Sequence, residues 1–139
     1  MNRGYLKKLQ HAVELHASGC LEESTICYEE ILTEHPTSVE VLELLASALL
    51  ALKQFDRAEL AAEQALKNGT DGTVSRKIIG IVAEGKGDYP NAALVLSDLL
   101  QSNPNDYDLL MNLGLAQRGM GDLPAAKKHL GDSIVVQDT

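Results

Sequence analysis

Apolar residues recur along this chain with a spacing of three to four in eight segments, which short stretches rich in glycine and polar residues separate. This spacing is typical of amphipathic α-helices. Gly19, Gly87 and Gly121 stand where helices would end, because glycine readily adopts the left-handed conformation of a helix C-terminus. Pro90 and Pro124 lie where helices would begin, a position that tolerates the missing N–H of proline. We expect helices at residues 5–17, 21–34, 39–52, 55–67, 73–85, 89–102, 107–119 and 123–136.

One local motif recurs at a fixed interval. Residues 85–93 read Gly-Lys-Gly-Asp-Tyr-Pro-Asn-Ala-Ala, and residues 119–127, thirty-four positions later, read Gly-Met-Gly-Asp-Leu-Pro-Ala-Ala-Lys. Residues 53–58 and 19–24 hold weaker versions of the motif at the same interval. A constant interval of this length predicts an array of stacked repeats. The four units are residues 5–38, 39–72, 73–106 and 107–139.

Each unit holds a small side chain at two fixed positions, where paired helices would approach closely. These residues are Ala12, Ala46, Gly80 and Gly114 in the first helices, and Ser24, Ala58, Ala92 and Ala126 in the second helices. The interval and these positions resemble the tetratricopeptide repeat, a helix–turn–helix unit. The resemblance implies an all-α fold, a right-handed α-solenoid of four helix–turn–helix repeats with eight helices. It also implies one tetratricopeptide-repeat domain over residues 1–139.

The segment from Val74 to Val82 admits a second interpretation. It is rich in β-branched residues and could form a buried strand. The segments at the same phase of the neighbouring units, 39–52 and 107–119, are strongly helical in pattern. We therefore expect a helix here as well.

The composition restricts the classes of partner. The formal net charge is −8 over 139 residues. This charge disfavours binding to nucleic-acid phosphates and to anionic membranes. No apolar run is long enough to cross a bilayer, and the polar stretch Met1–Leu6 has no apolar signal segment behind it. We expect a cytoplasmic protein without membrane insertion, in which Cys20 and Cys27 are free thiols.

The sequence contains no recognisable catalytic, cofactor-binding or metal-binding motif. Residues 80–86 match the first seven positions of a phosphate-binding loop, but Gly87 replaces the Ser or Thr that would hold magnesium. No two of the four histidines have the i, i+4 spacing that directs two imidazoles at one metal. We expect a protein that is not an enzyme and that carries no cofactor.

The resemblance implies that the first helices of the units line a concave groove that binds peptides. Many residues at the phases expected to face this groove are aliphatic, and exposed aliphatic patches often mark binding sites. Burial of some of them between adjacent helices is the alternative. The expected groove residues are Leu9, Val13, His16, Glu43, Leu44, Ser47, Lys77, Ile78, Ile81, Met111, Asn112 and Leu115.

We expect a protein–protein interaction module whose groove binds an apolar or amphipathic peptide or helix. Glu40, Glu43, Glu84 and Asp108 would favour basic residues in the ligand. Two alternatives stay open: a structural scaffold that self-associates, and the repeat region of a larger enzyme such as a glycosyltransferase. A co-purifying partner, a mass that rises with concentration, and further coding sequence beyond Thr139 would distinguish the three.

The fourth unit is the last in this sequence, and we expect its forward side to lack the cover that a following unit would give. Leu109, Met120, Ile134 and Val136 lie at the phases that such a unit would cover. A terminal repeat usually has a polar outer face. These four residues therefore predict a self-association edge and a homodimer through the C-terminal unit.

Overall fold

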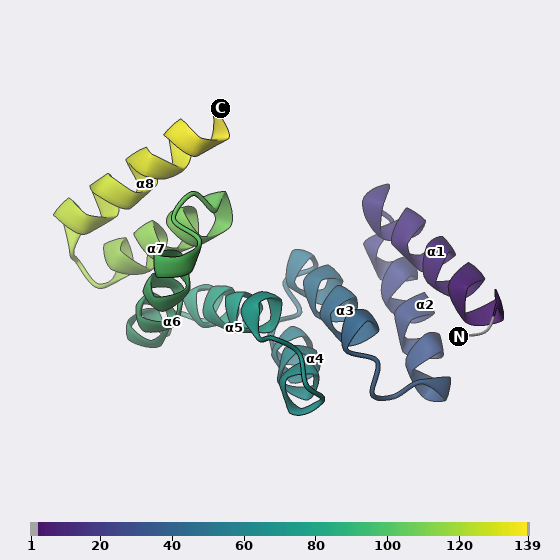
Figure 1. The fold of residues 1–139 in the computed structure, drawn as a ribbon. Coiled ribbons are helices and arrows are strands. Elements are labelled where there is room, and N and C mark those ends of the chain that lie inside the picture. The colour runs from purple at the N-terminus through teal and green to yellow at the C-terminus, as the bar shows by residue number, and fades with distance from the viewer. Residues whose placement is uncertain (1–2, 139) are drawn as a thin grey trace. The chain divides into compact units, whose positions relative to one another are not determined.

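The computed structural model describes residues 3–138, and this range contains eight α-helices and no β-strand (Figure 1). Each predicted helix is present, with ends that differ from the prediction by at most two residues. The segment from Val74 to Val82 is helical, as expected. The helices are α1 (Arg3–Ala17), α2 (Leu21–Glu34), α3 (Val39–Ala51), α4 (Phe55–Lys67), α5 (Thr73–Gly85), α6 (Tyr89–Ser102), α7 (Tyr107–Gly119) and α8 (Leu123–Gln137).

The chain divides into two compact units. The first extends to Ile78 and the second begins at Ile79, so the division falls within α5. The single domain over residues 1–139 stays a prediction.

Small side chains are completely buried in the packed helices of the first unit. There α1 packs on α2, α2 on α3, and α3 on α4. Ala12, Ser24, Ala46 and Ala58, which the sequence assigns to close helix contacts, are all completely buried. Tyr28 is the largest of the completely buried side chains. The small residues thus allow α-helices to approach each other closely, as the repeat pattern predicts.

The second unit is built around an aliphatic core between α6 and α7, and α8 packs on α7. The buried members of this core are Ala92, Leu96, Leu99, Leu109, Leu113 and Ala116. Gly114 is required by the α7–α8 contact, because a Cβ there would lie 2.6 Å from Cγ of Leu130. Gly80 is constrained in the same way, by Cδ2 of Leu96 at 2.9 Å.

Leu109 corrects the expected self-association edge. It is 1% exposed and belongs to the core of the second unit, so it does not lie on an exposed edge. The physical reason is its place in the first turn of α7, on the side that packs against α6.

Candidate functional site

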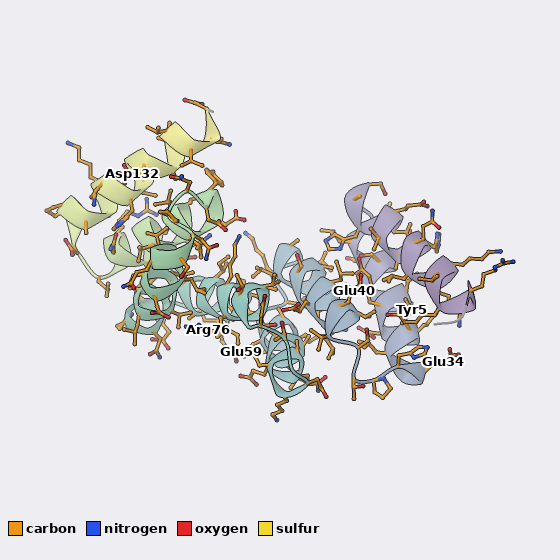
Figure 2. All side chains as sticks on the ribbon, viewed as in Figure 1. Tyr5, Glu34, Glu40, Glu59, Arg76 and Asp132 are labelled. Atoms are coloured by element: carbon orange, nitrogen blue, oxygen red, sulfur yellow. The ribbon has the colours of Figure 1, made fainter. Side chains whose placement is uncertain are left out.

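An open pocket of about 450 Å³ lies beside α3 in the first unit. We call it the α3 groove and define it by its lining residues, which are Val39, Glu40, Glu43, Leu44 and Ser47 from α3 and Val74 from α5. Glu40 lies in the first turn of α3 (Figure 2). Most of the lining surface is apolar, and an apolar pocket with a few polar groups is the usual form of a binding site.

The helical pattern of α3 places these residues together. Glu40, Glu43, Leu44 and Ser47 are spaced by three or four positions, so they share one face of the helix. The remaining faces of α3 are buried and hold most of its aliphatic residues, namely Val41, Leu42, Leu45, Ala46, Ala48 and Leu49. The core therefore fixes the direction in which the groove residues point.

Glu43 is held by hydrogen bonds from neighbouring hydroxyl groups. Its Oε2 accepts a bond of 3.0 Å from Oγ1 of Thr70 and one of 2.8 Å from Oγ of Ser75. Ser75 is completely buried. Glu43 thus joins α3 to the start of α5, whereas Glu40 is the exposed carboxylate of the α3 groove. Glu40 is therefore better placed to meet a basic ligand residue.

Three of the expected groove residues lie in the interior instead. Leu9 is 9% exposed, Ile78 is 4% exposed and Asn112 is 6% exposed. The side-chain amide of Asn112 donates a hydrogen bond of 2.8 Å to the carbonyl oxygen of Asp108. These residues pack within their units, as the alternative of burial between adjacent helices anticipated, and are not available to a partner.

His16 interacts with an aromatic side chain of the core. Its Nδ1 lies 2.9 Å from the hydroxyl oxygen of Tyr28, and the two rings meet edge to face. Burial raises the pKa of Tyr28 to about 12, with a smaller contribution from Cys27. The phenol therefore stays neutral, and the contact fixes the imidazole at the α1–α2 interface.

The other expected groove residues are partly accessible. Val13 is 39% exposed, and Lys77, Ile81, Met111 and Leu115 are half-buried. Of the twelve residues, Glu43, Leu44 and Ser47 line the α3 groove. Val39 was not expected there, and its signal in the sequence is its place at the start of the second repeat, directly before Glu40.

Glu84 differs from the other carboxylates that were expected to favour basic ligands. Burial raises its pKa, and the guanidinium of Arg118 acts in the opposite direction. Because Glu84 is half-buried, it is less accessible to a basic residue of a ligand than an exposed carboxylate would be. Asp108, by contrast, is exposed on α7.

Exposed large apolar side chains lie just before α8, at its first residue and in its last turn. Of the expected edge residues, Met120 is 44% exposed, Ile134 is 59% exposed and Val136 is half-buried. Leu123 at 62% and Val135 at 65% were not expected. Leu123 is the first residue of α8, whereas Val135 lies beside Ile134 in its last turn.

The described residues give no sign of a metal centre. Between residues 3 and 138, no three His, Cys, Asp or Glu side chains are grouped so that they could hold a metal ion. Cys20 and Cys27 are free thiols, as expected. Among the described helices, none combines the length and the apolar character needed to cross a membrane.

Comparisons with known proteins agree with this architecture. A model of the tetratricopeptide repeat matches residues 27–73 and 79–133. The protein KINESIN LIGHT CHAIN-RELATED 3 of Arabidopsis thaliana is 34% identical over 58% of this chain. The match spans 15% of the length of that relative. Among solved structures, MamA (41-end) from Desulfovibrio magneticus RS-1 has a TM-score of 0.81 at 20% identity, covering 98% of this chain and 77% of that one. A further MamA crystal structure has a TM-score of 0.77 at 18% identity, covering 96% and 73%. The chain therefore belongs to the tetratricopeptide repeat family, whose fold supports a protein-interaction scaffold.

Proposed function

We propose that this protein is a non-enzymatic interaction module whose α3 groove binds an apolar or amphipathic peptide segment of a partner protein. The observation that carries the proposal is the apolar lining of the groove by Val39, Leu44 and Val74. Val74 is 45% exposed, although it occupies the first turn of a packed helix. A partner side chain that covers these residues removes apolar surface from water.

The size and charge of the α3 groove suit a short peptide segment. A volume of about 450 Å³ falls in the range of known ligand pockets and accommodates a few side chains. Full burial of one large aliphatic side chain is worth roughly 1.5–3 kcal/mol, so two such anchors give binding in the weak to moderate range. Glu40, the exposed carboxylate of the α3 groove, favours a basic residue beside the apolar anchors.

Selection from random peptides displayed on phage tests this proposal. We expect enriched peptides to combine two or more aliphatic residues with a lysine or arginine. Synthetic versions should bind the protein in fluorescence anisotropy titrations. Val74→Lys places a long charged side chain on the groove surface, and its exposure lets the variant fold, so we expect it to weaken binding about tenfold or more.

Leu94→Lys is the matched control. Leu94 is 70% exposed on α6 and does not line the α3 groove, so this variant changes charge and apolar surface without touching the site. Equal loss of binding in both variants would show a general charge effect and contradict the proposal. Failure to enrich any peptide over an unrelated helical protein would do the same.

A second candidate function is self-association through the exposed apolar residues of α8. The exposed fractions of Leu123, Ile134 and Val135, all above one half, favour it. A second copy of the chain would cover this surface in a two-fold arrangement, in which each copy offers the same residues.

A further inference from the structure

The second helices of three repeats present an aliphatic residue to solvent at the same repeat position. These residues are Ile26 on α2 at 58% exposure, Leu60 on α4 at 56% and Leu94 on α6 at 70%. The fourth repeat has Lys128 at this position. Single exposed aliphatic residues are ordinary on protein surfaces, so the surroundings of each one decide whether it can serve a purpose.

Glutamates surround Ile26. Residues three and four positions away on a helix lie beside a side chain on the same face, and for Ile26 all four are glutamates. These are Glu22, Glu23, Glu29 and Glu30, and all four are exposed. α2 contains no lysine or arginine. Ile26 is thus an apolar side chain in a field of negative charge.

An ion pair connects the glutamate-rich face of α2 to the face of α4 that holds Leu60. Nη2 of Arg57 on α4 binds Oε1 of Glu29 on α2, one turn from Ile26. Leu60 lies one turn beyond Arg57 on the same face of α4, with Asp56 and Glu63 also one turn away. We call this surface the acidic ridge. It comprises Ile26 and Leu60 with Glu22, Glu23, Glu29, Glu30, Asp56, Arg57 and Glu63, that is, six carboxylates and one guanidinium, for a formal charge of −5.

We propose that the acidic ridge of α2 and α4 binds a basic amphipathic helix of a partner protein, at a site separate from the α3 groove. The aliphatic side of such a helix covers Ile26 and Leu60, while its lysines or arginines meet the surrounding carboxylates. Amphipathic helices bind other surfaces in this way, through apolar anchors spaced by three or four residues.

The charge of the ridge selects this occupant. Six carboxylates attract a cationic partner and raise its rate of association, and they repel anionic membranes and nucleic acids. The negative field is also felt by Cys27 on α2. Burial raises the pKa of its thiol, and the carboxylates of Glu30 and Glu23 raise it further.

Leu94 supplies an internal control. It has the same repeat position and a larger exposed fraction than Ile26 or Leu60. Its neighbours at three and four positions are Pro90, Asn91, Ser97 and Asp98, which include a single carboxylate. If a partner recognised only exposed apolar side chains, it would bind Leu94 as strongly as Ile26. A basic helix would instead prefer Ile26, because carboxylates surround it.

The probe for the experiment is a synthetic amphipathic helix of leucine and lysine, about five turns long, and the reference peptide has glutamate in place of lysine. We expect the lysine peptide to bind in anisotropy titrations, with an affinity that falls as salt is added, and the glutamate peptide not to bind. Ile26→Ser with Leu60→Ser should weaken binding about tenfold or more, whereas Leu94→Ser should leave it unchanged.

Two further variants distinguish binding at the acidic ridge from binding elsewhere on the protein. Arg57→Gln removes the only cation of the ridge and frees Glu29, so we expect tighter binding of the lysine peptide. The α3 groove also accepts aliphatic and basic side chains, so Val74→Lys, which alters that groove, should weaken binding of the lysine peptide less than the Ile26 and Leu60 double variant does. Binding that is lost in Val74→Lys but kept in the Ile26 and Leu60 double variant would place the peptide in the α3 groove and overturn the proposal. Equal binding of the glutamate peptide, weaker binding by Arg57→Gln, or no binding of the lysine peptide would also overturn it.

Discussion

The side chain of Glu43 on α3 accepts a hydrogen bond of 2.8 Å from the hydroxyl group of Ser75 on α5. The same carboxylate oxygen accepts a bond from Thr70 in the intervening loop. This loop contains Gly69 and Gly72, both at positive φ. Glu43 therefore connects the second repeat to the third across a segment whose glycines give it little stiffness of its own.

Replacing Glu43 tests the importance of this connection. In Glu43→Leu the buried hydroxyl group of Ser75 loses its acceptor, and we expect a loss of about 1–3 kcal/mol in the free energy of unfolding. Amide exchange in residues 68–76 should become faster. Glu40→Leu is the control, because Glu40 lies on the same face of α3 but is exposed. Equal effects of the two substitutions on chemical denaturation would contradict this prediction.

The loop at residues 68–72 should exchange its amide hydrogens fastest among the three junctions between repeats. The other two junctions contain Pro36 and Pro104, which restrict the backbone, whereas this one has two glycines. Neighbouring repeats stabilise each other mainly through nearest-neighbour contacts, so a flexible junction is also where an array opens first. Exchange measured by mass spectrometry would contradict this if all three junctions were protected equally.

Lys53 adopts a backbone conformation that favours glycine. Its φ is 60°, and it stands at the repeat position where Gly19, Gly87 and Gly121 have φ between 82° and 87°. A side chain in the left-handed region costs about 1–2 kcal/mol, which glycine avoids at some cost in the entropy of the unfolded chain. We expect Lys53→Gly to raise stability by about 0.5–1 kcal/mol in chemical denaturation. Lower stability than the parent protein would show that the lysine side chain makes a compensating contact.

The fold could be predicted from the sequence because the repeat imposes the same requirements four times. Ala12, Ala46 and Gly114 recur at one position, and each is buried where two helices meet. The strand-like composition of residues 74–82 was outweighed by this repeat phase, and the segment is helical. A single copy of such a segment would not have resolved the choice between strand and helix.

The candidate site was less predictable, because a repeat position fixes the side of a helix but not the degree of burial. Leu44 and Ile78 occupy the same repeat position, yet Leu44 lines the α3 groove and Ile78 is buried. Glu43 was expected to attract ligands, but its hydrogen bonds to Thr70 and Ser75 connect residues about thirty positions apart. Such contacts depend on side-chain geometry that no sequence pattern specifies.

Glu84 should make the stability of the protein depend on pH. Burial raises its pKa above the ordinary value of 4.5. The folded protein therefore binds the proton on Glu84 more tightly than the unfolded chain does. The contribution of this proton to the free energy of unfolding is present at low pH and is lost as the pH rises through the folded pKa. We expect Glu84→Gln to be more stable than the parent protein at neutral pH, and the difference to vanish below pH 4.5.

Arg118 provides the control for this prediction, because its guanidinium lowers the pKa of Glu84. Arg118→Gln should lower the free energy of unfolding at neutral pH, because Glu84 loses a neighbouring positive charge. As the pH is lowered, this variant should regain stability at a higher pH than the parent protein does. In the Glu84→Gln background the same change should have a smaller effect. A pH dependence of thermal unfolding that is identical in the parent protein and Glu84→Gln would argue against this assignment.

The apolar surface of α8 predicts a concentration-dependent homodimer. Ile134 and Val135 are both more than half exposed, and full burial of each is worth roughly 1.5–3 kcal/mol. Because Leu109 belongs to the core, it is unsuitable for testing the edge, since a buried charge there would destabilise the second unit itself. We instead expect Ile134→Glu with Val135→Glu to keep the fold and to be monomeric in light scattering at concentrations where the parent protein dimerises. Leu94→Glu adds a charge at an exposed site on α6 and should still dimerise. A parent protein that stays monomeric up to its solubility limit would show that a second copy does not cover this surface.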